Sequence, residues 1–389
     1  RAVYSSSNGL EKRPKLRFPG FDEPWKMVSL QDISEYRKNK ISVSKSKYIS
    51  TENMMQNFAG IIPYTSEEDI SGVEFCVGDT LLANIRPYLR KAWLATHDGA
   101  CSTDVLALCP SDITPAFLNN IIEQDRFIDY VMSGVKGSKM PRGDKAHILA
   151  YETAVPSLLE QEKINSFMQL LHQRIAKIQT KIELLKKYKR GLLHKVFLQS
   201  RRSNWGRKCL QEIASFTGGG TPSKDVASYW NGTIAWISSS DLQEDWIDTI
   251  SITRRITTDA IENSATKICP KGSIAIVSRV GVGKVAIMPE ELCTSQDFIN
   301  VTALAGNTRF MAYQIAYKMK VEAARTQGTS IKGITTDTIK SLEVDIPSDE
   351  EQEYLARMLS AFDSILHCEI HQLDALVKQR RALLQQIFT

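Results

Sequence analysis

The chain has 389 residues, of which 42% are hydrophobic and 24% charged, and its formal net charge is +5. This length exceeds the ~250–300 residues at which single hydrophobic cores stop growing, so it favours two or more domains over one. No stretch approaches the ~20 apolar residues that cross a bilayer, and the first residues lack the apolar core of a signal peptide, which predicts a cytoplasmic protein without contact to a membrane.

Seven cysteines occur without any CxxC pair, and they are Cys76, Cys101, Cys109, Cys209, Cys269, Cys293 and Cys368. An odd number at irregular spacing argues against a disulfide framework and against a zinc ribbon. We therefore expect reduced and mostly buried thiols and no bound metal. The pI near 8.7 is compatible with a polyanionic partner but is common among other proteins too.

A leader segment, 1–25, precedes the first predicted domain, 26–155. This domain mixes β-rich runs such as VEFCVGDTLLANI with turn clusters and a helical stretch at 116–132. Such a mixture predicts an α+β domain with a curved sheet.

Basic side chains gather at three places in this first domain. Arginine is the commonest contact to base edges and lysine mostly positions phosphates, so the clusters are candidate DNA contacts, although each residue alone is more ordinary as a solvated charge. The candidates are Lys38 and Lys40, then Arg86, Tyr88, Arg90 and Lys91, and finally Lys139 and Arg142 beside a Gly-Ser turn.

Residues 156–199 predict one long helix. Its apolar residues recur every seven positions, which is the seam of a coiled coil, at Ile164, Leu171, Ile178, Leu185 and Leu192. Ser157 follows a proline and is placed to cap the helix. The segment carries nine Lys or Arg against three Glu.

The second predicted domain, 200–346, is again α+β, with a helical stretch at 309–325. Its run GGGTPSKDVASYWNGTIAWISSSDL begins with three glycines whose backbone amides are candidates to contact phosphate, while a tight turn entering a strand explains the run equally well. The candidate contacts of this domain are Thr221, Ser223, Lys224, Arg279, Lys284 and Lys332.

Residues 347–389 predict a second long helix with its seam at Leu355, Phe362, Leu376 and Leu383, interrupted by Glu369 and Arg380. Residues 348–389 carry four Lys or Arg against seven Asp or Glu, so this helix is charged oppositely to the first. We expect the two to pair. Chain order makes the pair antiparallel, and about 40 residues span roughly 60 Å, enough to hold two domains apart.

The chain is a duplication. Residues 156–197 align with 347–388 at a constant offset of 191, and eleven of the forty-two pairs are identical. A weaker match upstream relates Trp25 to Trp205, Ser102 to Ser295 and Asp104 to Asp297. The predicted architecture is a domain followed by a helix, twice, with internal pseudo-twofold symmetry.

Three segments resemble catalytic or cofactor-binding motifs, but each lacks a residue that its motif requires. GVGK at 281–284 has Ser278 where a phosphate-binding loop needs glycine, and NIRPY at 84–88 has Arg86 where a base methyltransferase has proline. His367 and His371 lie one helical turn apart, but Cys368 stands where a zinc protease needs glutamate. We assign no catalytic residue and no cofactor to this chain.

Three features together resemble the specificity subunit of type I restriction–modification systems. They are PKLRFPGFDEPW at 14–25, the paired Pro-x-x-x-Glu-Gln helices ending RGLLHKVF and RALLQQIF, and the GGTPS…YWNGTIAW run. The first domain departs from the pattern, because Lys38, Asn39 and Lys40 stand roughly where GGTPS is expected.

The resemblance implies two target recognition domains, each contacting one half of an asymmetric bipartite DNA site, and helices that dock two modification (methyltransferase) subunits. S-adenosylmethionine would then bind to those subunits, and ATP and Mg to two restriction (motor-nuclease) subunits. Two other classes stay open: a non-enzymatic coiled-coil scaffold joining two protein-binding domains, and a fused restriction enzyme.

Overall fold

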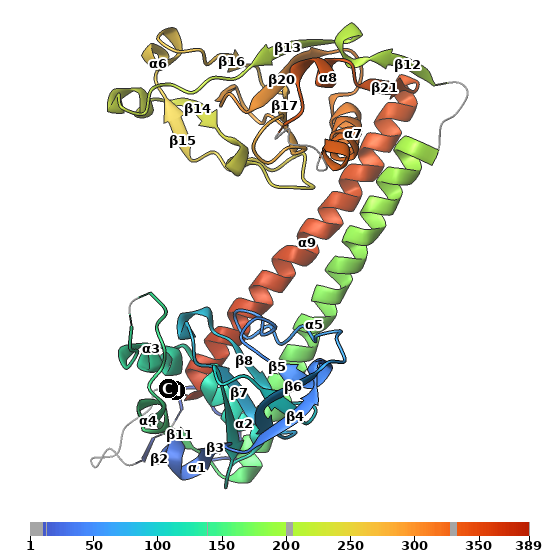
Figure 1. Ribbon diagram of the computed structural model, residues 1–389. Helices are drawn as coiled ribbons and strands as arrows, with labels where there is room; N and C mark the ends of the chain where they lie inside the picture. The colour runs from blue at the N-terminus through green and yellow to red at the C-terminus, as the bar shows by residue number, and fades with distance from the viewer. Residues whose placement is uncertain (1–10, 13, 138, 200–204, 327–332, 389) are drawn as a thin grey trace. The chain divides into compact units, whose positions relative to one another are not determined.

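A computed structural model describes residues 11–12, 14–137, 139–199, 205–326 and 333–388. The chain divides into two compact units, the first made of Arg1–Gln179 with His371–Thr389 and the second of Thr180–Ile370. Figure 1 labels most of their helices and strands. Every helix in the described part of the chain is too short or too polar to span a lipid bilayer.

Unit 1 holds three small sheets, in the orders β1-β2-β11, β3-β10-β7-β8 and β4-β6-β9-β5. Their strands are β1 Glu11–Lys12, β2 Trp25–Ser29, β3 Ser34–Tyr36, β4 Lys40–Ser44, β5 Tyr48–Ile49, β6 Asp69–Phe75, β7 Thr80–Ala83, β8 Ala92–Leu94, β9 Gly99–Cys101, β10 Val105–Pro110 and β11 Glu152–Val155. Its short helices are α1 Leu30–Ile33, α2 Pro115–Ile122, α3 Asp125–Ser133 and α4 Lys145–Leu149.

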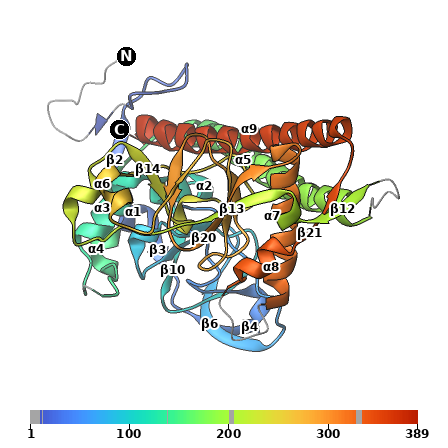
Figure 2. The same ribbon diagram turned by 90° about the horizontal axis from the view of Figure 1, so that it is seen from above.

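Unit 2 repeats this arrangement, with sheets in the orders β12-β21, β13-β20-β17-β18 and β15-β14-β19-β16. Its strands are β12 Gly206–Cys209, β13 Ala214–Gly218, β14 Ile234–Ile237, β15 Arg254–Ile256, β16 Ile268–Cys269, β17 Ile274–Val277, β18 Val285–Ile287, β19 Leu292–Thr294, β20 Phe298–Leu304 and β21 Glu343–Ile346. Its short helices are α6 Thr258–Glu262, α7 Thr308–Thr326 and α8 Thr336–Lys340, and both views place α7 beside α8 (Figures 1 and 2).

The second sheet of each unit has the same strand order, because β3, β10, β7 and β8 correspond in chain order to β13, β20, β17 and β18. The third sheets share a parallel pair, β5 with β9 and β14 with β19. They differ in one added strand each, at opposite edges: β4 pairs with β6 in unit 1, whereas β15 pairs with β14 in unit 2. The duplication predicted from the helices therefore extends through the sheets, apart from one edge strand in each unit.

One predicted helix is broken. The stretch 116–132 forms α2 and α3, because the chain turns extended at Gln124, directly after Glu123 closes the C-terminus of α2. The corresponding stretch of unit 2, 309–325, is continuous in α7.

Two long helices, α5 Leu158–His194 and α9 Asp349–Phe388, pair in antiparallel fashion, as their charges and chain order predicted. In unit 2 the Lys181 Nζ lies 2.6 Å from the Glu369 Oε1. About two turns further along α5, the ring of Tyr188 stacks on Phe362, which lies earlier in α9. A π-helical turn, Lys195–Gln199, follows α5.

The predicted seam lies on the inner side of these helices. A second apolar stripe runs beside this seam. Its residues Met168, Ile182, Leu359 and Leu366 are at most 4% exposed, Ile175 is 9% exposed and Leu373 is half-buried. Of the seam residues, Ile164, Ile178 and Leu376 are buried and Leu171, Leu185, Leu192, Leu355, Phe362 and Leu383 are half-buried. The two interruptions are used by ion pairs, Glu369 with Lys181 and Arg380 with Glu123.

The Pro-x-x-x-Glu-Gln motif joins each long helix to its sheet domain. Gln161, 1% exposed, donates to the Pro156 carbonyl at 3.0 Å and accepts from the Thr114 amide at 2.9 Å. In unit 2, Gln352 does the same with Pro347 at 3.0 Å and with the Asn307 amide at 2.8 Å. The motif is therefore a clamp that satisfies buried backbone groups.

Its glutamate holds a tryptophan. The indole of Trp25 donates to Glu160 at 3.2 Å, and the indole of Trp205 donates to Glu351 at 3.0 Å. Trp25 is 2% exposed and packs edge-on against Phe388, the last described residue of α9. The end of α9 therefore completes the core of unit 1.

The seven thiols are free, as expected, but only Cys101, Cys269 and Cys293 are buried. Burial raises the pKa of Cys101 to about 12 and those of Cys269 and Cys293 to about 11. The expectation that most cysteines are buried is wrong, because Cys368 is exposed on α9 and the remaining three are half-buried.

Candidate nucleic-acid interface

Each unit carries a hairpin whose connecting residues face a second loop. In unit 1 residues 84–91 join β7 to β8, and in unit 2 residues 278–284 join β17 to β18. We call these segments the recognition hairpins. Each begins with the same contact, since the Asn84 amide donates to the Asp104 carbonyl and the Ser278 amide to the Asp297 carbonyl, both at 2.8 Å.

The recognition hairpin of unit 1 lies against residues 134–137 and 139–144, here named the recognition loop. The Arg86 amide donates to the Pro141 carbonyl at 2.8 Å, and the Gly143 amide donates to the Asn84 carbonyl at 3.1 Å. The structure thus brings together two clusters that stand about fifty residues apart in the sequence.

Several candidates are exposed at this junction. Arg86 is exposed and holds a left-handed backbone, φ 52°, which is uncommon for arginine and is often found at functional sites. Tyr88 is 50% exposed. Arg142 is exposed and lies 3.0 Å from the carboxylate of Asp104, and Lys139 is exposed in the recognition loop.

Asp144 closes the recognition loop. It accepts a hydrogen bond from Lys136, and its Oδ1 also accepts from the backbone amides of Ala146 and His147 as the cap of α4. These donors lower the pKa of Asp144 to about 2. Asp144 is therefore ionised at the base of the recognition loop, where it pairs with Lys136, while Arg86 of the recognition hairpin and Lys139 of the recognition loop are exposed.

Unit 2 places its recognition hairpin in the same setting. The Ile334 amide, two residues before the start of α8, donates to the Ser278 carbonyl at 2.8 Å. Arg279 is exposed, and its neighbour Val280 is 70% exposed. Lys332 lies outside the described residues.

Three predicted contacts point inward instead. Lys91 donates to the Thr51 carbonyl at 2.6 Å, and its counterpart Lys284 donates to the carbonyls of Ser239 and Leu242 at 3.0 and 2.9 Å. Arg90 forms an ion pair with Asp125. These cations hold the hairpins in place, and sequence alone gives no signal for it because the acceptors come from distant segments.

The triple glycine is explained by packing. An added Cβ would lie 2.0 Å from the Ser295 carbonyl at Gly219 and 2.4 Å from the backbone of Ala265 at Gly220. Both amides are already used, Gly219 by the Phe298 carbonyl and Gly220 by the Thr294 carbonyl. The interpretation that these two amides contact phosphate is therefore wrong. The alternative of a tight turn entering a strand is wrong as well, because Gly218 ends β13 and the next two glycines leave this strand in close contact with other backbone.

The remaining candidates lie outside the two recognition hairpins and outside the recognition loop. Lys38 and Lys40 are exposed, the latter as the first residue of edge strand β4. Ser223 and Lys224 are exposed and Thr221 is half-buried, in the stretch after the glycines. The Trp230 indole donates to the Ser223 carbonyl at 3.0 Å, which folds this stretch back on itself.

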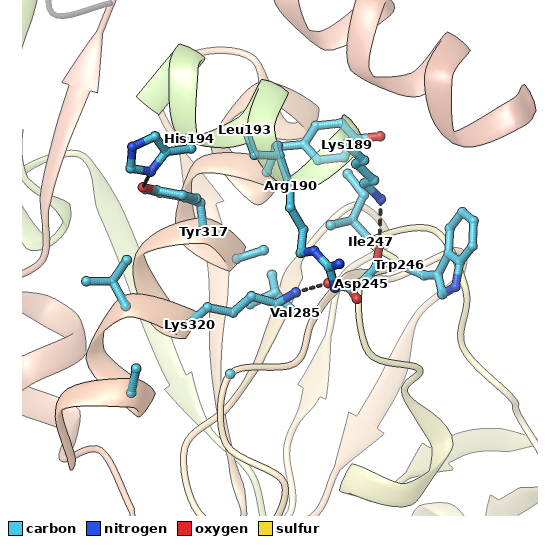
Figure 3. A pocket seen from close by; sticks show the side chains of 15 residues that line it. Lys189, Arg190, Leu193, His194, Asp245, Trp246, Ile247, Val285, Tyr317 and Lys320 are labelled. Carbon is cyan, nitrogen blue, oxygen red and sulfur yellow. Dashed lines mark hydrogen bonds and ion pairs between the residues drawn. The ribbon is translucent and has the colours of Figure 1, made fainter. Parts of the chain in front are cut away.

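A hollow of about 320 Å³ lies in unit 2 between α5, α7 and the loop at 245–247 (Figure 3). Lys320 forms an ion pair with Asp245 at its edge, and burial lowers the pKa of Lys320. Tyr317 and Leu193 give it an apolar wall.

No group of three or more His, Cys, Asp or Glu side chains among the described residues could hold a metal ion. Of the histidine pair considered above, the ring of His367 packs edge-on against Trp246 at 3.8 Å between centroids. His367 therefore has a packing role.

Comparison with known proteins identifies one family. Residues 202–377 match the model of the type I restriction modification DNA specificity domain. The chain is 32% identical over 179 residues to the type I restriction enzyme MjaIX specificity subunit of Methanocaldococcus jannaschii, and 30% identical over 167 residues to the EcoR124I/EcoR124II specificity subunit of Escherichia coli. These alignments cover 45% and 41% of this chain, and each spans 41% of the relative.

Longer matches are weaker in identity. The chain is 21% identical to the putative MjaX specificity subunit of M. jannaschii over 97% of its own length and 96% of the relative. Its fold is similar to the crystal structure of the type I restriction-modification S subunit from M. genitalium, with a TM-score of 0.60 at 15% identity, covering 97% of this chain and 99% of that one.

Proposed function

We propose that this chain is a DNA-recognition subunit of the type I restriction–modification specificity family, whose domain model matches residues 202–377, and that both units are target recognition domains. Each domain contacts one half of a bipartite DNA site. We further propose that the boundaries are 26–155 and 200–346 for the two domains, with 1–25 as leader and 156–199 and 347–389 as spacer helices.

The observation that carries the proposal is the repeated recognition hairpin. Two copies of one fold present exposed arginines, Arg86 and Arg279, at corresponding positions of the loop between the third and fourth strands of the same sheet. Arginine offers paired donors that match guanine in the major groove, and each such contact contributes ~1–3 kcal/mol of discrimination. Pseudo-twofold proteins suit bipartite sites.

The half-sites differ because the domains differ where they are most exposed. The edge of the third sheet carries Lys40 on β4 in unit 1, whereas unit 2 has β15 on the other side of its parallel pair. The hairpins also differ, with Tyr88 in one and Val280 in the other. We expect an asymmetric target.

The partners follow from the helices. α5 is basic and α9 acidic, and both expose apolar side chains such as Leu184, 62% exposed, and Tyr354, 64% exposed. Two similar helices suit two copies of one partner, so we propose docking of two modification subunits, with two restriction subunits joining in the full cytoplasmic complex. Chemistry would then reside in those partners, with S-adenosylmethionine in the modification subunits and ATP and Mg in the restriction subunits, and this chain would be non-catalytic.

The test is DNA binding by the chain with its modification subunits, across salt concentrations, on the site found by methylome sequencing. Phosphate contacts predict a steep fall of affinity with salt. Arg86→Ala should relax preference at one half-site and Arg279→Ala at the other, by roughly 5- to 150-fold. Lys378→Ala, which removes one exposed charge from α9, should leave both preferences unchanged.

A salt-independent association without sequence preference would favour the scaffold alternative instead. Methyl transfer by the purified chain alone would contradict its non-catalytic role.

A further inference from the structure

In unit 1, charged side chains connect the recognition hairpin to a spacer helix. Arg90, in the hairpin, pairs with Asp125 at the start of α3. The same carboxylate receives the Arg381 Nε of α9 at 2.5 Å and the Gln385 Nε2 of α9 at 2.8 Å. Asp125 is 9% exposed, so one buried carboxylate joins the hairpin and the helix.

In unit 2, a different set of residues makes an equivalent connection. Lys284 of the hairpin holds the carbonyls of Ser239 and Leu242. Three residues further along this loop, the Asp245 carbonyl accepts from the Lys189 Nζ of α5 at 2.7 Å (Figure 3). The loop 239–246 therefore links the hairpin to the helix.

Lys189 is the buried centre of that connection. It is 5% exposed, its ammonium lies 4.9 Å from the centroid of the Trp246 ring, and it pairs with Asp363 of α9 at 2.5 Å. Asp363 in turn accepts from the Tyr313 hydroxyl at 2.8 Å. Four elements meet at one ammonium group: α5, α9, α7 and the loop.

A buried ion pair is weak evidence for stability, because removing its charges from water offsets most of their attraction. Its better supported use is to fix one geometry among several of similar energy. Here both copies of the duplication keep the connection while using different residues, a carboxylate in unit 1 and an ammonium in unit 2. The two units therefore share the link between hairpin and helix, although different side chains form it in each unit.

We propose that Asp125 and Lys189 are positioning residues that hold each recognition hairpin at a fixed angle on its spacer helix, so that sequence discrimination at one half-site depends on each. They touch no base themselves. This inference rests on the proposed DNA-recognition function and names the residues through which the helices act on it.

The test measures the penalty for a single base change in each half-site, using the full chain assembled with its modification subunits and synthetic duplexes. Such a penalty is roughly 5- to 150-fold in specific complexes. Asp125→Asn should lower it about fivefold or more at the half-site of unit 1 and leave the other within about twofold. Lys189→Met should do the reverse, and Lys189→Arg should restore discrimination.

Two further variants keep the test decisive. Arg381→Gln removes the helix side of the link at a side chain that is 58% exposed, so it should fold even if Asp125→Asn does not, and it should relax the same half-site. Arg17→Gln breaks a bidentate pair with Glu160 in the same unit, away from the hairpin. It should lower the melting temperature while both penalties stay unchanged.

The proposal is overturned if Asp125→Asn and Arg381→Gln weaken binding to every sequence alike and keep the penalties intact, because that is the signature of a purely structural role. A wild-type complex without any base penalty would instead contradict the proposed function, so the two failures are distinguishable.

Discussion

Single residues carry meanings that their type alone does not reveal. Lys91 and Lys284 were predicted from clusters of basic residues, and those clusters do lie at the recognition hairpins. Their ammonium groups nevertheless point at backbone carbonyls about forty residues away in sequence. A sequence pattern shows where charge is concentrated but gives no information about which acceptors the fold brings near it.

The glycine run gives a residue-scale prediction. Gly219→Ala places a Cβ 2.0 Å from the Ser295 carbonyl, inside any tolerable contact, so we expect a loss of ~2 kcal/mol or more in the free energy of unfolding. In a unit of this size that lowers the melting temperature by roughly 4–8 °C. Thermal unfolding of the full chain, followed by circular dichroism, measures it.

Gly218→Ala is the matched control, since its Cβ would meet open space. Its melting temperature should stay the same or rise slightly, because alanine restricts the unfolded chain. Equal losses of melting temperature for both variants would contradict the close approach of Gly219 to the Ser295 carbonyl.

At the scale of elements, the heptad spacing predicted both long helices, and the apolar period carries that information because it is local. The break between α2 and α3 could not be predicted in the same way. Glu123 ends α2 while accepting from Arg380, which arrives from the other end of the chain. Elements whose limits depend on such distant contacts have no local signature.

The clamp at the start of each long helix supplies an element-scale prediction. Gln352→Leu takes the hydrogen-bond partner from the half-buried Asn307 amide and from the buried Pro347 carbonyl, and a buried group without a partner costs about 1–3 kcal/mol. We expect Gln352→Leu and Gln161→Leu to destabilise by similar amounts, ~2–4 kcal/mol each, in urea unfolding.

Gln379→Leu, an exposed position on α9, serves as its control and should change the free energy of unfolding by less than ~0.5 kcal/mol. A loss in only one of the two clamp variants would mean that the duplicated motif no longer has a duplicated role.

At the scale of the whole molecule, the repeat at offset 191 was the most informative feature of the sequence, because two copies of one helix imply two copies of what it is joined to. The common strand order of the second sheets confirms this. The edge strands β4 and β15 were not predictable from the repeat, since divergence has erased the similarity there. These are also the positions at which two recognition domains are free to differ.

We expect the length of the helix pair to set the number of base pairs between the two half-sites. We expect removal of one heptad from each helix to shorten the pair by ~10 Å, which corresponds to about three base pairs at ~3.4 Å each. The contacts now identify the segments to remove, 176–182 and 369–375. In α5 the removed segment ends before Lys189, and in α9 it lies between His367 and Arg380, so these contacts between helix and domain are kept. Whole heptads also keep the apolar seam in register.

The doubly shortened chain, assembled with its modification subunits, should methylate a site with the same two half-sites and about three fewer base pairs between them, with reduced activity. The reduction follows because three base pairs also rotate one half-site by roughly 100° about the DNA axis, at ~10.5 base pairs per turn. Removing four residues from each helix is the control, since it breaks the seam and should abolish assembly. If the doubly shortened chain assembles and still prefers the original spacing, the spacing is set by the modification subunits and the helices only join the domains.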